Sequence, residues 1–192
     1  MQIRIISIAI STFVTVAAPV AGAESFYVEG NYNRVQTDSE PLSEFQGDDT
    51  EFDAIGFRAG YNFATNLAIE GEFLAGLSDD IYAQLTEDGS PVAARASLET
   101  NAGVFVRAGV PVTEKVQAFA RVGYATTQFA HTYYADDPDL STTVTRTNDG
   151  PAYGVGATID ISENIYLRTD YTLHDTDEVD TGTLSIGAGL RF

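Results

Sequence analysis

Apolar and polar residues alternate with a period of two along most of the chain after Ser25. This alternation is typical of β-strands with one apolar and one polar face, whereas an amphipathic helix would repeat every 3.6 residues. Segments rich in turn-forming residues separate the alternating runs. The pattern predicts eight strands, over residues 26–33, 54–61, 67–76, 94–108, 116–124, 153–160, 165–174 and 184–192.

The predicted connections alternate in length. Residues 62–66, 111–115 and 162–164 form tight turns, and residues 36–50, 78–92, 130–150 and 175–181 form longer loops. Short turns at one end and longer loops at the other are typical of an up-and-down antiparallel meander. No linker divides the run, so we expect one all-β domain over residues 24–192.

The first 23 residues have the features of a secretory signal peptide. Arg4 precedes an apolar stretch over residues 5–20, and Ala21-Gly22-Ala23 offers small residues to a signal peptidase. An uncleaved membrane anchor is the alternative, but Pro19 breaks a helix just before the cleavage site. No later segment has the roughly 18 consecutive apolar residues of a transmembrane helix.

Composition excludes several classes of protein. The chain has 28 acidic and 10 basic residues, and loss of residues 1–23 removes only Arg4, which leaves a net charge of −19. Nucleic acid is not an expected partner, because its phosphates need a basic surface. The absence of cysteine excludes disulfides, thiolate metal sites and a cysteine nucleophile. A hydrophobic content of 44% is too high for a disordered acidic tail.

The polar faces of the predicted strands are rich in glycine. Glycine only weakens a strand on a solvated face, but it makes room for large side chains inside a narrow barrel. We therefore expect the polar face to line a barrel interior. Its ten glycines are Gly56, Gly60, Gly76, Gly103, Gly109, Gly123, Gly154, Gly156, Gly187 and Gly189.

The same faces carry nearly balanced charges, although the chain is strongly acidic. Charges enclosed in a barrel must be paired, because an unpaired buried charge costs several kcal/mol. We expect an interior charge network formed by Glu29, Arg58, Glu70, Glu72, Arg95, Glu99, Arg107, Arg121, Arg168, Asp170 and Arg191.

The apolar faces are free of charge over about nine to eleven residues, the length of a tilted strand that crosses a bilayer. A closed barrel also leaves no unpaired backbone edge in lipid. We therefore predict an eight-stranded antiparallel up-and-down transmembrane β-barrel. Aromatic residues near strand ends are expected to form its interfacial girdle, namely Phe26, Tyr61, Phe129, Tyr153, Tyr171 and Phe192.

The last strand carries the most specific motif. Its segment from Ser185 to Phe192 is similar to the C-terminal assembly signal of small outer-membrane barrels of the OmpA transmembrane-domain, OmpX and opacity-protein kind. The resemblance covers residues 24–192 and implies recognition of Gly187, Leu190 and Phe192 by the barrel-assembly machinery. Leu190 departs from the pattern, which more often has an aromatic residue there. The resemblance implies fold and a Gram-negative outer-membrane location, but it says little about activity.

Two lipid-modifying enzymes use barrels of this size, and neither pattern fits. The deacylase type resembles a His and a Ser two residues apart on a lipid-facing strand. Here Tyr133 follows His131 and Thr176 follows His174 at that spacing. The palmitoyltransferase type has an amphipathic helix before the first strand, for which the sequence leaves no room. We therefore assign no catalytic residue.

The longer loops are strongly acidic, with 17 acidic residues and one base, Arg146. Carboxylates suit Ca²⁺ or Mg²⁺, but no loop matches a calcium-binding motif such as the EF-hand. We therefore assign no metal site and no cofactor. Shared divalent ions with lipopolysaccharide phosphates are a hypothesis from charge alone.

An eight-stranded barrel is only wide enough to be filled by its own side chains. Tyr27, Phe105, Phe119, Tyr166 and the arginines are available to fill it. We expect a plugged, monomeric barrel that contacts lipid and lipopolysaccharide and has an envelope-structural or surface-interaction role. A narrow porin-like ion channel is the alternative, and a lipid-modifying enzyme is the third hypothesis.

Overall fold

The computed structural model describes residues 25–37, 50–85, 91–133, 142–176 and 180–192, and the predicted signal peptide lies outside them. The described residues contain no helix that is long and apolar enough to cross a membrane. The described strands are β1 (Ser25–Thr37), β2 (Thr50–Ala64), β3 (Leu67–Gly76), β4 (Asp79–Leu85), β5 (Pro91–Pro111), β6 (Val116–Tyr133), β7 (Thr142–Asp160), β8 (Ile165–His174) and β9 (Thr181–Arg191).

All strands form one antiparallel sheet that closes on itself. Apart from β3 and β4, each strand pairs with its neighbour in sequence. β1 pairs with β9, and β3 pairs with both β2 and β5. β4 pairs with β5 directly beyond β3, so β3 and β4 together are one barrel strand interrupted at residues 77–78. The predicted eight-stranded antiparallel up-and-down barrel is confirmed.

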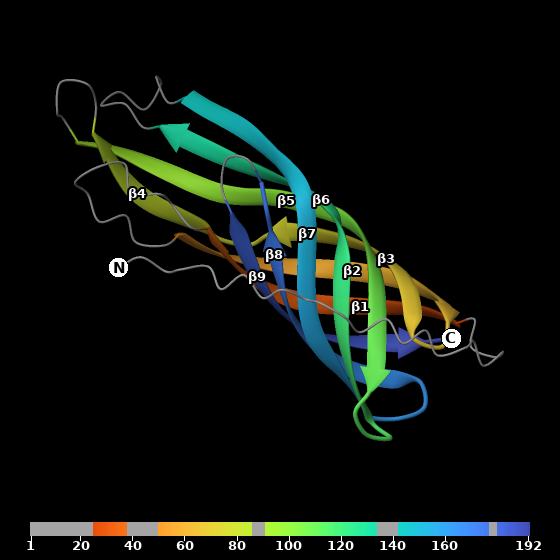
Figure 1. Cartoon of the computed structure of the whole chain (residues 1–192). Helices are drawn as coiled ribbons and strands as arrows, with labels where there is room; N and C mark the ends of the chain where they lie inside the picture. The colour runs from red at the N-terminus through yellow and green to blue at the C-terminus, as the bar shows by residue number, and fades with distance from the viewer. Residues whose placement is uncertain (1–24, 38–49, 86–90, 134–141, 177–179) are drawn as a thin grey trace, which may run out of the picture.

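β4 and the outer parts of β5, β6 and β7 extend well beyond the other strands at the end that carries the long connections, here called the loop end (Figure 1). β5 has 21 residues, β6 has 18 and β7 has 19, whereas β8 has 10. The predicted loops over 78–92 and 130–150 are therefore too long, because β4 and the outer parts of these three strands occupy much of them. The opposite end, with the tight turns, is called the turn end.

A β-bulge in β5 reverses which residues face inward. Leu98 pairs with Phe129, and the ladder then skips Glu99 before pairing resumes. On the loop side of the bulge Ala96 and Leu98 are buried, whereas on the turn side Asn101 is buried. The predicted phase of residues 94–99 is therefore wrong, because one extra residue moves the following side chains to the other face.

The outer wall of the barrel is apolar. Large hydrophobic side chains from every barrel strand are exposed there, including Phe57, Val104, Val155 and Ile186, each at least half exposed. Eight charged side chains in the middle of these strands are buried instead: Glu29, Arg58, Glu70, Glu72, Arg107, Arg121, Arg168 and Asp170. This is the reverse of a soluble barrel, and it confirms the predicted orientation of the two faces.

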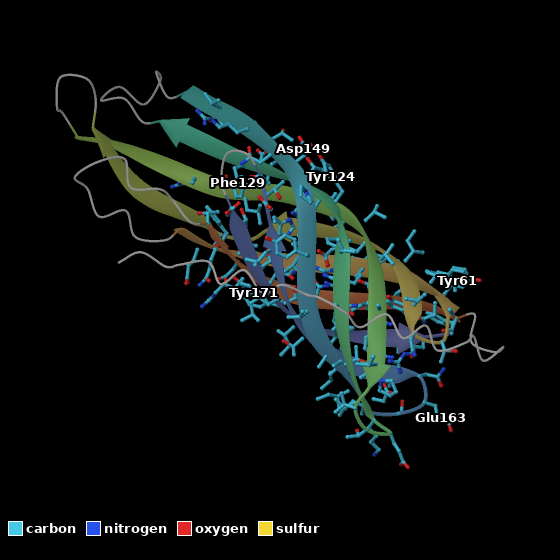
Figure 2. All side chains as sticks on the ribbon, in the orientation of Figure 1. Tyr61, Tyr124, Phe129, Asp149, Glu163 and Tyr171 are labelled. Carbon is cyan, nitrogen blue, oxygen red and sulfur yellow. The ribbon has the colours of Figure 1, made fainter. Side chains whose placement is uncertain are left out.

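The predicted aromatic girdle is wrong at one position. Phe26, Tyr153, Tyr171 and Phe192 are exposed on the outer wall, and Tyr61 is partly exposed. Phe129 instead points into the barrel, where its ring centroid lies 5.8 Å from that of Phe52. Figure 2 labels Phe129 on the ribbon near the loop end. The residue has inward parity in β6, so its sequence position already favoured the interior.

Candidate functional site

The middle of the barrel interior is filled by paired charges around Arg58, whose side chain is fully buried. Its Nη1 lies 2.6 Å from Glu29 Oε1, and its Nη2 lies 3.3 Å from Asp170 Oδ1. Its Nε donates a hydrogen bond of 2.8 Å to Glu72 Oε2, and Nη2 also pairs with that oxygen. One guanidinium therefore joins three carboxylates from three different strands.

Three further arginines complete the network. Arg121 Nη1 lies 2.9 Å from Glu72 Oε2, and its Nε lies 3.3 Å from Asp170 Oδ1. Arg168 Nη1 lies 2.6 Å from Glu70 Oε1. Arg107 Nε lies 3.4 Å from the same Glu70 oxygen. The interior charge network is thus four arginines and four carboxylates: Glu29, Arg58, Glu70, Glu72, Arg107, Arg121, Arg168 and Asp170.

Aromatic side chains fill the space between these charges. The guanidinium carbon of Arg121 lies 4.1 Å from the ring centroid of Phe105, and that of Arg168 lies 4.2 Å from the centroid of Phe119. Tyr27 donates a 2.5 Å hydrogen bond to a Glu70 oxygen. Stacked guanidinium groups gain cation–π attraction while their N–H groups remain available to carboxylates.

Three residues predicted for the network lie elsewhere. Arg95 and Glu99 are exposed, because the bulge turns this part of β5 over, and their predicted interior position is wrong. Arg191 does face the lumen, but it lies at the turn end and pairs with Asp160 at 2.6 Å, with both side chains partly exposed. The sequence carries no signal for the bulge. Ala94, Ala96 and Leu98 are small or apolar, so they are acceptable on the lipid-facing side and in the interior alike.

The predicted crowding around interior glycines is present. A Cβ atom built on any of the ten polar-face glycines would come within 3.0 Å of a neighbouring atom. At Gly60 that neighbour is the ring of Tyr27, and at Gly189 it is the ring of Tyr166. Gly30 and Gly71 are on the outer wall instead, where a Cβ would meet nothing within 4 Å. Glycine thus makes room for the aromatic filling of the interior.

Two further layers lie between the charge network and the loop end. The first is polar: Asn33 donates a 2.7 Å hydrogen bond to Asn31, and Ser185 donates one of 2.5 Å to Asn33. The second, the upper apolar layer, consists of Val35, Phe52, Ala54, Leu74, Ala96, Leu98 and Phe129.

The interior offers little free volume near the charge network. A cavity beside Arg107 and Tyr166 at the turn end has a volume of about 10 Å³, about the space that one water needs.

The outer part of the long strands forms an extended sheet beyond the barrel rim. β7 pairs with β8 only over residues 152–160, and its residues 143–146 pair with β6 on one side. No second strand pairs with residues 143–146 within the described chain. All four side chains are exposed. This edge offers backbone donors and acceptors to another extended chain.

The remaining sequence-based candidates occupy ordinary strand positions. Gly187 faces the interior, and Leu190 and Phe192 face outward, with Phe192 72% exposed. His174 is buried inside the barrel, and His131 lies in β6. Among the described residues, no three His, Asp or Glu side chains are grouped as metal ligands. Most of the acidic loop residues lie outside the described residues.

An apolar outer wall, a charge-paired interior and long connections at one end together define an outer-membrane type of β-barrel. The comparison with family models agrees. Residues 6–192 match the outer membrane protein beta-barrel domain, and the chain belongs to this family. Its members are placed in the Gram-negative outer membrane, as we predicted for this chain.

Solved structures share the fold at low sequence identity. Ail, the attachment invasion locus protein of Yersinia pestis, is 16% identical, with 88% of this chain and 99% of Ail covered and a TM-score of 0.59. Neisserial surface protein A is 13% identical, with 88% and 100% covered and a TM-score of 0.57. OprG from Pseudomonas aeruginosa is 14% identical, with 88% and 96% covered and a TM-score of 0.58. No curated protein matches the sequence.

Proposed function

We propose that this protein is a plugged outer-membrane barrel that presents its extended sheet for interactions at the cell surface. The observation that carries the proposal is the edge of β7, where residues 143–146 pair with β6 on one side only. An extended segment of a partner can add to such an edge through main-chain hydrogen bonds. The edge stands beyond the rim, where membrane lipid does not cover it.

The charge of the loop end supports a basic partner. Glu51, Asp149, Asp175 and Asp180 are exposed there, and the longer connections contain many more acidic residues. One structure of Ail contains the heparin analogue sucrose octasulfate, a polyanion. The acidic loop end of this chain would repel such a ligand, so we propose a partner segment rich in Lys or Arg.

The charge network and the upper apolar layer support a closed interior. A diffusing ion would have to displace four arginines that are held by carboxylates and stacked on rings. Breaking such a buried pair costs about 3–5 kcal/mol. We therefore favour the plugged barrel over the narrow channel. Cleavage after Ala23 and recognition of Gly187, Leu190 and Phe192 during assembly are part of the proposal.

Conductance of the folded 24–192 barrel in planar bilayers tests the plug. We expect no steady conductance steps. Steps of defined size would support the channel instead and would make the interior arginines a selectivity path.

Binding of short strand-forming peptides tests the surface role. We expect a Lys/Thr alternating peptide to bind the folded barrel and a Glu/Thr peptide of equal length not to bind. Substitutions V144P and T145P probe the edge, because neighbouring N–H groups in a strand point to opposite sides. One of the two substitutions removes an N–H group that bonds to β6, and the other removes an N–H group on the open edge. We expect the substitution on the open edge to abolish peptide binding in a barrel that still folds. Equal binding of both peptides would contradict the proposed partner chemistry.

A further inference from the structure

The outer wall contains a groove that is not part of the interior or of the extended sheet. It crosses β2, β3, β5 and β6 obliquely and has a volume of about 700 Å³. Sites for single small ligands have volumes of roughly 300–1,000 Å³. Most of its lining is apolar, and it lies within the wall that faces lipid.

Strand register explains the shape of the groove. Ala59 on β2 pairs with Gly71 on β3. One row further toward the loop end, Ala102 on β5 pairs with Phe73 on β3 and with Thr126 on β6. Ala59, Gly71, Ala102 and Thr126 form a floor without large side chains. A Cβ atom on Gly71 would meet nothing within 4 Å, so the floor is open above this residue.

Large side chains form the two sides. Phe57 and Phe73 are a cross-strand pair on the loop side of the floor, and Val104 and Tyr124 are a pair on the turn side. All four are at least half exposed. A long, narrow apolar ligand would contact both pairs at once.

The groove ends at a polar position on β7. Thr126 pairs with Asp149, and the Tyr124 hydroxyl donates a hydrogen bond to the Asp149 carboxylate. Figure 2 shows Tyr124 and Asp149 close together. A carboxylate at this end repels a headgroup with a net negative charge and favours a part of the headgroup that donates hydrogen bonds or carries positive charge.

We propose that the groove binds one acyl chain of a membrane lipid whose headgroup places an ammonium group at Asp149. The groove is continuous with the lipid-facing wall, which favours an acyl chain as its apolar ligand. The charge of Asp149 selects the headgroup. The lipid is held at one place on the wall, in contrast to the exchanging lipid around the rest of the barrel.

Photolabelling in nanodiscs tests the proposal. The probe is phosphatidylethanolamine with a diazirine in one acyl chain, at low fraction in phosphatidylcholine, and mass spectrometry locates the labelled peptides. We expect labels concentrated on residues 57–73 and 102–126. Labels spread evenly over the outer wall would overturn the proposal.

Two outward glycines provide a matched pair of variants. G71F fills the floor of the groove, whereas G30F adds the same side chain to open space on β1, outside the groove. We expect G71F to reduce groove labelling roughly tenfold, as loss of contact with one or two methylenes does, and G30F to leave it unchanged. Slower migration of the boiled than of the unheated sample verifies folding. If G71F does not fold, A102L narrows the same floor by less.

The headgroup is tested separately. We expect D149N to remove the preference of the groove for phosphatidylethanolamine over a phosphatidylglycerol probe with the same acyl chain. Equal labelling of wild-type protein by both probes would overturn the assignment of the ammonium group. Equal loss of labelling in G71F and G30F would overturn the groove itself.

Discussion

The turn-side and loop-side halves of the barrel use their interiors differently. The turn-side half encloses four arginines and four carboxylates among aromatic rings, whereas the loop-side half encloses amides, hydroxyls and then the upper apolar layer. Only the first half has the charged lumen that the alternation predicted. The two halves meet near the bulge at Glu99.

This difference shows how much one extra residue decides. On the turn side of the bulge, Arg107 faces the interior and contributes to the network. On the loop side, Arg95 has the same parity and is exposed. Both are arginines in one uninterrupted alternating run of sequence, so their different environments come from the ladder and not from their local sequence.

The largest expected effect separates Arg58 from Arg95. R58A leaves Glu29, Glu72 and Asp170 without their shared partner, so we expect a loss of about 3–5 kcal/mol in the free energy of unfolding. R95A removes an exposed side chain and should unfold like wild type. Urea unfolding of both variants in detergent micelles, followed by tyrosine fluorescence, checks this. Equal destabilisation would mean that the charge network is not the stabilising feature.

Glycine variants compare the interior with the outer wall. G156V forces a side chain against Phe119 and Asp170, and overpacking of this kind costs about 1–3 kcal/mol. G30V places the same side chain in open space on the wall, where valine also favours the strand. We expect G156V to lower the urea midpoint and G30V to keep or raise it. The reverse order would contradict the crowding explanation.

A smaller effect is expected at the turn end. Arg191 and Asp160 pair at 2.6 Å, but both side chains are partly exposed. Such pairs contribute about 0–1 kcal/mol and weaken with salt. We expect R191Q to lower the urea midpoint of unfolding slightly at low salt and hardly at all at an ionic strength of about 0.5 M. A loss as large as that of R58A would place Arg191 in the central network.

Single-cysteine labelling should leave the fold almost unchanged and locate the bulge. The natural chain has no cysteine, so R95C and A96C each add one thiol. With the bulge in place, position 95 is exposed and position 96 is buried within the upper apolar layer. We expect a water-soluble maleimide to label R95C quickly and A96C slowly in the folded barrel. The opposite pattern would mean that β5 alternates without interruption.

Much of the charge network could be predicted from the sequence. Eight of the eleven proposed residues form it, because the ladders around these eight positions, including Arg107 on the turn side of the β5 bulge, keep their inward parity. Arg95 and Glu99 could not be placed, since a bulge leaves no mark where both phases are chemically acceptable. The upper apolar layer was missed for the same reason, as Ala96 and Leu98 were assigned to the lipid-facing side.

The outer groove also depends on long-range register. Ala59, Gly71, Ala102 and Thr126 come from four strands and are unremarkable small residues within their own runs. They form a floor only because the ladders place them side by side.

The amino-acid pattern is enough to predict the strands, the closed antiparallel barrel and which face meets lipid. These features follow from local alternation and composition, which act on every residue without knowledge of its distant neighbours. Tertiary structure alone decided the bulge, the extent of the outer sheet, the partners of each arginine and the groove. Those features depend on the relative register of strands, and register is set by pairing energies summed over residues far apart in the chain.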